Sequence, residues 1–362
     1  MGFSTLNEWL EFQQGINPKE IDLSLDRVQT LYNKLQINIP EKNVFLIGGT
    51  NGKGTTTSIL EQLFRKKGYK TGAFTSPHLT QYNERVRINL NNSFDQDWVS
   101  AFEIIEAVRG DVSLTYFEFS TLAAFQILSN HDCDAWFIEV GLGGRLDATN
   151  IIESSVSVLT SIAMDHEEWL GDSIDKIAKE KVGIAKRNRP LIFGDVVAVD
   201  VIQEGSLEKG SELRKKGEDF NGRIDQGHYS FNGVHQSIEE IVLPKSWGDG
   251  EIDNLTTALA AMEANEQFFP THDLLQEIID EFILPGRFEL LDLHHRWILD
   301  VAHNPSAAEN LRQRIDRSKI NSDFSSTMRE ENNTSSTATK GGRRSNRIMP
   351  MNNLEDAKNS FE

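Results

Sequence analysis

The segment Asn43-Val-Phe-Leu-Ile-Gly-Gly-Thr-Asn-Gly-Lys-Gly-Thr-Thr-Thr57 decides the fold class that we predict for this chain. It begins as an apolar, strand-like run, breaks into a glycine-rich turn, and continues with a lysine and hydroxyl residues that open a helix. Glycines let backbone N–H groups approach phosphate oxygens, Lys53 can reach the outer phosphates, and a helix N-terminus adds a positive dipole. The segment therefore predicts a triphosphate-binding loop.

The glycine spacing of this loop departs from the usual phosphate loop. It runs Gly48-x-x-x-Gly52-Lys53-Gly54-Thr55, with one residue fewer between the glycines and an extra glycine before the hydroxyl. A Gly/Lys cluster after a strand can also be a tight turn without any ligand. The loop by itself leaves both interpretations open.

The composition limits the classes of protein to which the chain can belong. Its 362 residues are enough for two domains, and a net charge of −18 leaves no basic face for a nucleic-acid partner. The single cysteine, Cys133, excludes an intramolecular disulfide and fits a reducing cytosol. The sequence shows no N-terminal signal and no apolar run of membrane-spanning length. We therefore expect a cytoplasmic protein without nucleic-acid or membrane partners.

Strand-like and helix-like segments alternate along most of the chain. Apolar, β-rich runs predict strands at 44–47, 70–75, 135–140, 155–161 and 190–193, with a short edge-like strand at 84–90. Amphipathic runs predict helices at 55–67, 98–108, 118–129, 173–185 and 254–266, and residues 205–250 predict a small irregular or β-rich excursion. This alternation predicts an α/β fold with a parallel sheet flanked by helices. Ligands bind beyond the carboxyl ends of such strands, where the glycine-rich loop lies.

Three strand ends carry candidate metal ligands. Glu139 ends a strand expected beside the loop strand, a usual position for a carboxylate that holds Mg²⁺ near a β/γ-phosphate. Asp165 and His166 follow the next strand, although the histidine would be an atypical ligand because Mg²⁺ prefers oxygen. Ser76 stands in a Ser-Pro turn after another strand, and its hydroxyl could reach the metal. Each residue also has an ordinary structural interpretation, as a loop carboxylate, a hydrogen-bonding imidazole or a simple turn.

Lys181 has two possible roles. It shares a helix face with Ile177 and Ile184 by spacing. A lysine on an apolar face can extend its ammonium to the surface. A desolvated lysine with a lowered pKa could instead be carbamoylated and serve as a carboxylate-like metal ligand.

Two motifs that follow the predicted helix at 254–266 contain further polar groups. Pro285-Gly-Arg287-Phe-Glu289 has an arginine on a turn that enters a strand, and Asp300-Val-Ala-His303-Asn304-Pro305 ends a strand in polar residues. Neither motif identifies a function by itself.

Taken in order, the motifs resemble the folylpolyglutamate synthase/dihydrofolate synthase family of the ATP-dependent Mur ligase superfamily. The order is Gly49-Thr-Asn-Gly-Lys-Gly-Thr55, Thr75-Ser-Pro-His78, Tyr116-Phe-Glu-Phe119, Glu139-Val-Gly-Leu-Gly-Gly-Arg-Leu-Asp-Ala-Thr-Asn150, Asp165-His166, Glu180-Lys181, Pro285-Gly-Arg287 and Asp300-Val-Ala-His-Asn-Pro305. The resemblance covers roughly residues 4–311, and the motif at 139–150 is highly specific. Residues 6–28 look like the bifunctional enzymes of the Gram-negative type.

The resemblance implies a reaction. ATP phosphorylates a carboxylate of dihydropteroate, or of the terminal glutamate of a folate, to an acyl phosphate. The amine of L-glutamate then attacks, and phosphate leaves. The implied cofactors are ATP and Mg²⁺, the implied partners are the small-molecule substrates, and the implied state is a monomer.

The resemblance also implies roles for individual residues. It places nucleotide contacts at Gly49, Thr50, Asn51, Gly52, Lys53, Gly54, Thr55, Asn254, Arg287, Asp300 and His303. It places metal ligands at Ser76, Glu139, His166 and Lys181, the last carbamoylated beside a second Mg²⁺. It gives direct catalytic roles to Lys53, His166 and Lys181.

The match to the family is incomplete at the C-terminal side. We expect an ATP-binding Mur-ligase-type domain at 1–284 and the start of a Rossmann-like glutamate ligase domain at 285–317. Residues 318–362 are dominated by Ser, Thr, Asn and charged side chains, which predicts a disordered tail outside the family pattern. A strand and one helix cannot form an independent core, so we expect a truncated C-terminal domain, weak ATP binding and little ligation.

Three functions therefore remain open from the sequence. The first is a folate ligase, the second is a catalytically impaired nucleotide-binding remnant of that family, and the third is a phosphate-loop kinase or ATPase unrelated to folate.

Overall fold

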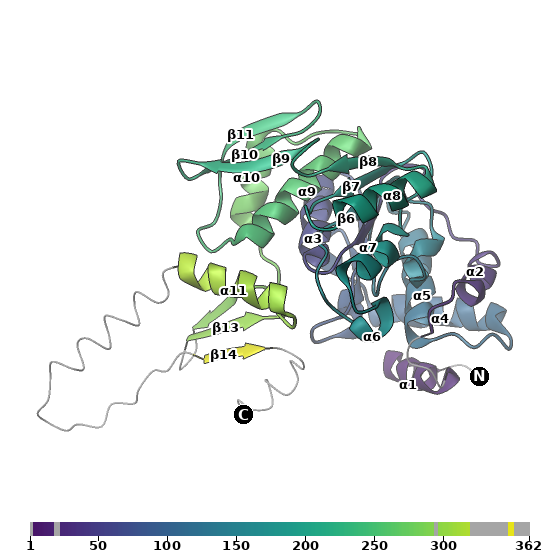
Figure 1. Cartoon of the computed structure of the whole chain (residues 1–362). Helices are drawn as coiled ribbons and strands as arrows, with labels where there is room; N and C mark the ends of the chain where they lie inside the picture. Colours follow the sequence, from purple (N-terminus) through teal and green to yellow (C-terminus); the bar gives the residue numbers. More distant parts are fainter. Residues whose placement is uncertain (1–2, 18–21, 293–295, 319–346, 351–362) are drawn as a thin grey trace, which may run out of the picture.

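The computed structural model describes residues 3–17, 22–292, 296–318 and 347–350. Figure 1 shows a main body built on one large sheet, with a smaller C-terminal part beside it. The large sheet has eight strands in the order β4-β3-β2-β5-β1-β6-β7-β8. These strands are β1 (Val44–Gly48), β2 (Thr71–Phe74), β3 (Val86–Ile88), β4 (Asn91–Asn92), β5 (Ala135–Glu139), β6 (Val156–Leu159), β7 (Pro190–Phe193) and β8 (Glu212–Lys215).

The predicted parallel sheet is confirmed. Strand β1 lies between β5 and β6 and pairs with both in parallel, and β2, β7 and β8 extend the parallel part of the sheet. The predicted edge-like strand at 84–90 forms the short 3-10 turn η1 (Tyr82–Arg85) and β3, which pairs antiparallel with β2. The carboxyl ends of β1, β2, β5 and β6 therefore open on the same side of the sheet, where ligands bind in α/β proteins.

Helices cover both faces of the main sheet, as Figure 1 shows. Along β1, Val44 and Leu46 join one hydrophobic core, while Phe45 and Ile47 join the other. The first core takes up α1 (Leu6–Ile16), α2 (Asp26–Tyr32), α4 (Asp95–Arg109), α5 (Tyr116–Asn130), α7 (Ile174–Val182) and α8 (Val199–Lys209). The second takes up α3 (Lys53–Lys66), α9 (Asp249–Asn265) and α10 (His272–Glu281). A strand buried on both faces explains why 44–47 reads as a continuous apolar run.

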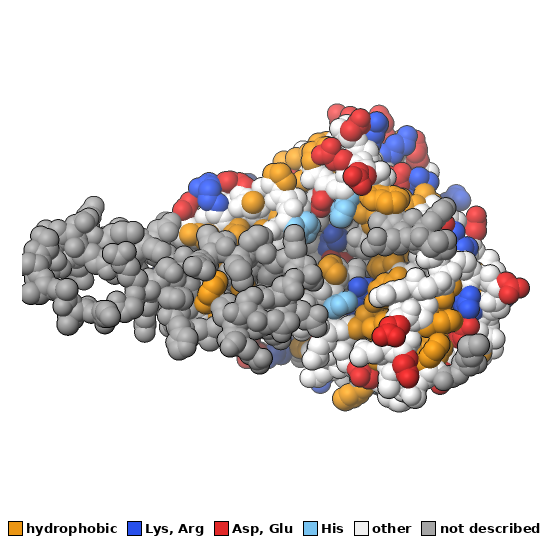
Figure 2. Space-filling model, turned by 90° about the horizontal axis from the view of Figure 1, so that it is seen from below, with side chains coloured by type: hydrophobic (Ala, Val, Ile, Leu, Met, Phe, Trp, Pro, Cys, Tyr) orange, Lys and Arg blue, Asp and Glu red, His pale blue; other side chains and the backbone are white. Residues whose placement is uncertain are grey.

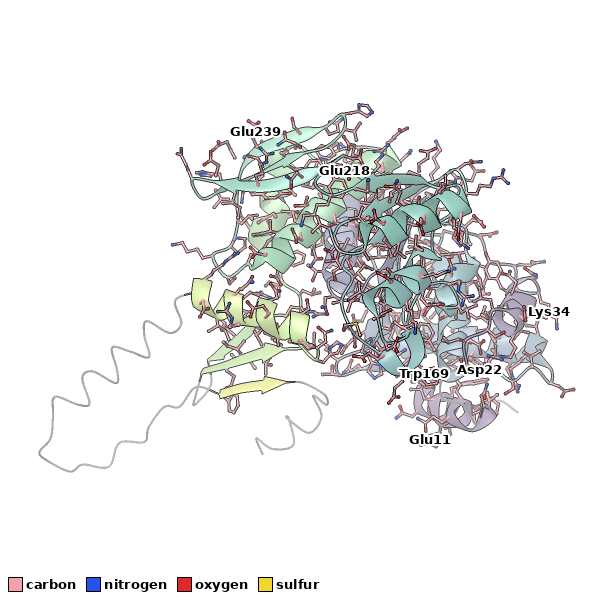
Figure 3. All side chains as sticks on the ribbon, viewed as in Figure 1. Glu11, Asp22, Lys34, Trp169, Glu218 and Glu239 are labelled. Atoms are coloured by element: carbon pink, nitrogen blue, oxygen red, sulfur yellow. The ribbon has the colours of Figure 1, made fainter. Side chains whose placement is uncertain are left out.

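The predicted excursion at 205–250 is only partly β-rich. Its residues 221–242 form a small antiparallel sheet of β9 (Asn221–Asp225), β10 (His228–Asn232) and β11 (Ser237–Val242). Residues 199–209, however, form α8, which the sequence did not predict because Gly205 lowers helix propensity. A Cβ at Gly205 would lie 2.4 Å from Val182 Cγ1, so this glycine lets α8 pack closely on α7. Figure 3 shows Glu239 on β11 at the opposite end of the view from Trp169 on α6 (Glu167–Leu170).

The C-terminal segment, residues 285–292 and 296–318, forms a hairpin and a helix. Strand β12 (Glu289–Asp292) pairs antiparallel with β13 (Arg296–Asp300), and α11 (Pro305–Arg317) follows. Strand β14 (Arg347–Pro350) pairs in parallel with β13. These four residues fall within the predicted tail, where β13 offers backbone partners and Ile348 and Met349 interrupt the polar run. The assignment of 318–362 as a disordered tail stays a prediction. The rest of the predicted tail, 319–346 and 351–362, lies outside the described residues.

Within the described residues, none of the helices is both long enough and apolar enough to cross a membrane.

Candidate functional site

The glycine-rich loop connects β1 to α3 and needs glycine at two positions. Gly49 and Gly52 have φ angles of 137° and 86°, which are unfavourable for residues with a side chain. A Cβ on Gly49 would lie 2.0 Å from Thr160 Oγ1, and one on Gly52 would lie 2.0 Å from Asn254 Oδ1. Thr50 N donates to Ser161 O at 2.7 Å, which fixes the loop on the end of β6. This structure supports a phosphate-binding loop over a simple tight turn.

Lys53 lies at the first residue of α3, and its side chain folds back over the loop. Its ammonium donates to Gly49 O at 3.2 Å and to Thr50 O at 3.1 Å. Desolvation lowers the pKa of Lys53, although the nearby Glu139 carboxylate partly offsets that effect. The lysine thus lies at the loop itself, within reach of a phosphate group bound there.

Lys181 reaches the same loop from α7. Only 4% of the residue is exposed, and its ammonium donates to Gly49 O at 2.8 Å. Burial, with a smaller contribution from the charge of Lys53, lowers the pKa of Lys181 to about 7. The ammonium does not extend to the surface, so the snorkelling interpretation does not fit this structure. The lowered pKa favours the neutral amine, which is the form that carbamoylation requires.

Glu139 and Ser76 meet where β5 and β2 end. Glu139 is buried and lies opposite Ile47 in the parallel pairing of β5 with β1. Its Oε2 accepts a hydrogen bond from Ser76 N at 3.3 Å. Burial raises the pKa of Glu139, while Lys53 and Arg287 act in the opposite direction. A cation bound beside this carboxylate would favour its charged form.

His166 lies at the N-terminal end of α6 in the left-handed region, with φ of 47°. About half of its side chain is exposed, and Nε2 is 3.9 Å from Asp165 Oδ1. Across the described part of the chain, no group of three or more His, Cys, Asp and Glu side chains is arranged to hold a metal ion. Ser76, Glu139 and His166 fit Mg²⁺ only in combination with phosphate oxygens, which is how proteins commonly bind this ion.

A single cavity of about 120 Å³ brings most of the predicted residues together. Its lining includes Gly49, Thr50, Asn51, Gly52, Lys53, Ser76, Glu139, His166, Lys181, Arg287 and His303. Figure 2 shows histidine and basic side chains gathered near the middle of the lower face of the molecule. Residues from four strand ends of the main sheet, from α7 and from the C-terminal segment thus converge on one polar cavity.

Four predicted residues lie outside the lining of this cavity. Gly54 and Thr55 belong to the first turn of α3, and Asn254 lies on α9 directly over Gly52. Asp300 is buried and accepts hydrogen bonds from Phe288 N and Ala302 N, both at 2.9 Å. Burial raises the pKa of Asp300, and Arg287 opposes that effect. In this structure Asp300 shapes the two turns that carry Arg287 and His303.

Two residues with clear roles in the site, Asn304 and Asp147, lie in the motifs noted in the sequence, but no role was predicted for either. Asn304 caps α11 and contacts the phosphate loop, yet its sequence signal is only that of a helix cap before Pro305. Asp147 accepts hydrogen bonds from Leu142 N at 2.8 Å and Thr149 N at 2.9 Å. It caps the short turn η2 (Ala148–Ile151) and shapes the glycine-rich stretch that follows Glu139.

A larger cavity, of about 820 Å³, lies at the amino ends of β1, β2 and β5. It contains none of the predicted site residues. Its Cys133 is buried, and burial raises the pKa of that thiol to about 12. The smaller cavity is the candidate active site because it holds the buried charged groups.

Comparison with known proteins agrees with this location of the site. Residues 47–262 match the family model for the Mur ligase middle domain. The chain is 40% identical over 312 residues to the dihydrofolate synthase/folylpolyglutamate synthase of Escherichia coli, which covers 86% of this chain and 73% of the relative. The chain belongs to this family.

Two solved structures extend the comparison. E. coli FolC in complex with DHPP and ADP has a TM-score of 0.82 at 40% identity, and the match covers 86% of this chain and 74% of that one. A bifunctional folylpolyglutamate synthase/dihydrofolate synthase with Mn, AMPPNP and L-glutamate bound has a TM-score of 0.79 at 35% identity, covering 86% and 75%. The α/β architecture of the chain is thus that of the family.

Proposed function

We propose that this chain is an ATP-dependent ligase that joins L-glutamate to dihydropteroate and to the terminal glutamate of folates. The observation that carries the proposal is the polar cavity in which the glycine-rich loop, Glu139 and Lys181 meet. Family members have been solved with ADP and DHPP, and with AMPPNP, Mn and L-glutamate. A cavity with buried cationic and carboxylate groups at the carboxyl ends of parallel strands suits phosphoryl transfer.

The reaction would proceed in two steps. A substrate carboxylate takes the γ-phosphoryl group of ATP, which releases ADP and forms an acyl phosphate. The amine of L-glutamate then attacks the acyl carbon, loses a proton, and expels phosphate as the amide bond forms. Both steps depend on positioning and on neutralisation of negative charge more than on covalent help from the protein.

Different residues of the cavity would bind the phosphates and the divalent cations. Backbone N–H groups of residues 49–55 and the ammonium of Lys53 would bind the phosphates, and Arg287 would add a further positive charge. Ser76, Glu139, His166 and Lys181 are the residues that would hold divalent cations, with Lys181 carbamoylated. Such cations neutralise charge on the phosphates during transfer. Asn254, Asp300 and His303 would complete the nucleotide side of the site.

We also propose a domain boundary near Pro285, a monomeric state and a cytoplasmic location. The boundary has support from the small separate sheet that β12 and β13 form after it. The single buried cysteine is compatible with a reducing compartment.

An ADP-release assay with Mg²⁺, ATP, dihydropteroate and L-glutamate, each omitted in turn, tests the proposal. We expect release to require all four components. Turnover without glutamate would instead indicate an unrelated kinase or ATPase. Retained binding of an ATP analogue without any turnover would indicate the impaired remnant.

A further inference from the structure

Asn150 is the last residue of the glycine-rich motif at 139–150, and its side chain contacts the C-terminal end of α7. Its Nδ2 donates to Arg145 O and to Gly183 O, both at 3.1 Å. The first bond lies within the motif, whereas the second reaches α7, because Gly183 is the C-cap of that helix. Asn150 therefore connects the motif with the helix that carries Lys181.

Lys186 holds the oxygen atoms of the same asparagine. Its Nζ donates to Asn150 O at 2.8 Å and to Asn150 Oδ1 at 2.9 Å. Burial lowers the pKa of Lys186 to about 8, so its ammonium pays a desolvation cost that these charge-assisted bonds offset. We refer to Asn150 and Lys186 together as the latch. Both the donor and the acceptor atom of the Asn150 amide are engaged in it.

The backbone of the motif packs directly on the last turn of α7. Arg145 N donates to Glu180 O at 2.8 Å. A Cβ on Gly144 would lie 2.9 Å from Lys181 O, and one on Gly183 would lie 2.3 Å from Arg145 Cβ. The two backbones approach this closely only because both glycines lack a side chain. The position of the turn that carries Lys181 thus depends on how firmly the motif is attached to it.

The two elements that the latch joins supply different groups to the polar cavity. Glu139 stands at the start of the motif, and Lys181 projects from α7 to place its ammonium 2.8 Å from Gly49 O. A shift of α7 relative to the motif would change the separation of these two side chains. Residues that orient metal ligands without touching the metal strongly affect metal sites in general.

We propose that Asn150 and Lys186 are positioning residues that fix the last turn of α7 against the glycine-rich motif and thereby hold Lys181 at the phosphate loop. Neither residue lines the cavity, so both act through Lys181 and not on a ligand. The inference rests on the proposed function for the reaction that Lys181 serves.

Three substitutions separate the two halves of the latch. Lys186→Met removes the ammonium and keeps a side chain of similar length, whereas Lys186→Arg supplies donors for both oxygens of Asn150. Asn150→Asp still accepts from Lys186, but it cannot donate to Gly183 O. The aspartate variant thus weakens the latch without leaving the charge of Lys186 unpaired.

Lys176→Met is the matched control on the same helix. The side chain of Lys176 is 63% exposed and pairs with Asp172 at 2.7 Å. This substitution removes a lysine from α7 and leaves the latch intact.

The first measurement is brief labelling with acetic anhydride, without nucleotide or bicarbonate, followed by mass spectrometry. Lys181 is buried, whereas Lys179 is exposed on the same helix and serves as the internal reference. We expect acetylation of Lys181 relative to Lys179 to rise at least about fivefold in Lys186→Met and Asn150→Asp, as the loss of a hydrogen bond implies. The ratio should stay unchanged in Lys186→Arg and in the control.

An unchanged acetylation ratio in both Lys186→Met and Asn150→Asp would overturn the inference, whether or not the protein binds ATP. The labelling therefore separates this inference from the proposed function.

The second measurement is steady-state kinetics in the ADP-release assay. We expect kcat to fall about tenfold in Lys186→Met, with KM for ATP unchanged, because the latch orients a cation-binding group and not the nucleotide. Lys186→Arg should restore kcat. An unchanged kcat in Lys186→Met, or one that Lys186→Arg does not restore, would contradict the positioning role. Absence of turnover in the unsubstituted protein would count against the proposed function instead, and the acetylation ratio would then decide the inference.

Discussion

The two ends of the main sheet carry cavities of opposite character. The cavity at the carboxyl ends has about 120 Å³ and is lined by Lys53, Lys181 and Glu139, whose pKa values are all displaced by burial. The cavity at the amino ends has about 820 Å³, and Asp134 at its rim is exposed. The volume of a cavity therefore does not identify the site in this fold. Buried charged groups identify the site, because the burial of a charge that has no function would only lower the stability of the fold.

The largest effect on turnover that we predict comes from removing the carboxylate of Glu139, at the carboxyl ends of the strands of the main sheet. Glu139→Gln should lower ADP release by at least about 100-fold, because the amide cannot provide the negative charge that a divalent cation requires. It should not lower the free energy of unfolding, since a neutral amide avoids the desolvation cost of the buried carboxylate. Rates measured by the ADP-release assay check the first expectation, and urea titration checks the second.

The matched control at the amino end is Asp134→Asn. Asp134 accepts a hydrogen bond from Lys70 N at 2.7 Å, which the amide oxygen of asparagine can also accept. We expect its activity to be unchanged. Equal losses of ADP-release activity in Glu139→Gln and Asp134→Asn would mean that the two ends of the sheet do not differ in function.

A smaller effect concerns the pH dependence of the free energy of unfolding, to which the amine of Lys181 contributes. The pKa of Lys181 falls from about 10.5 in the unfolded chain to about 7 in the folded protein. Below pH 7 both states are protonated, and the buried charge destabilises the fold. Between pH 7 and 10.5 the folded protein binds fewer protons than the unfolded chain, so stability rises with pH.

The comparison with Lys181→Met, made without bicarbonate or divalent cations so that the amine of Lys181 is not carbamoylated, measures this effect. The unfolding free energy of the unsubstituted protein should rise by about 2 kcal/mol relative to the variant between pH 7 and pH 9. Lys186, whose pKa burial lowers to about 8, titrates in both proteins and cancels in the difference. A difference that stays flat over this range would show that Lys181 is not desolvated.

The smallest effect is expected at Cys133, in the larger cavity. Burial raises the pKa of its thiol to about 12, so almost no thiolate forms at pH 7.5. We expect iodoacetamide to leave Cys133 unmodified in the native protein, as mass spectrometry can measure, and Cys133→Ala to retain full turnover. Rapid alkylation of Cys133 accompanied by loss of activity would instead indicate that the cavity at the amino ends of the strands has a role in turnover.

The sequence predicted those parts of the site that depend on local pattern. The apolar run before Gly48 and the strand ending at Glu139 are local features, and parallel pairing of their strands brings both to one edge of the sheet. Helix spacing placed Lys181 on the apolar face of α7, but only the fold shows its ammonium on Gly49 O. A hydrogen bond between elements distant in the chain leaves no periodic signal.

The C-terminal segment was less predictable for the same reason. The Asn51–Asn304 pair joins two polar residues 253 positions apart, and neither has a pattern that points to the other. Strand β14 was missed because four residues in a polar region carry little β signal, and pairing with β13 supplies what propensity does not. The prediction that the segment forms only the start of a domain stays a prediction.

The most direct test of the central claim is the affinity for AMPPNP with Mg²⁺, measured by isothermal titration calorimetry on Lys53→Ala and Lys42→Ala. These variants remove one lysine from the phosphate loop and one from the cavity at the opposite end. We predict that binding weakens by at least about 100-fold in Lys53→Ala, because a charge-assisted contact to phosphate is lost, and stays unchanged in Lys42→Ala. Unchanged affinity in Lys53→Ala would show that the glycine-rich loop does not bind the phosphates of the nucleotide.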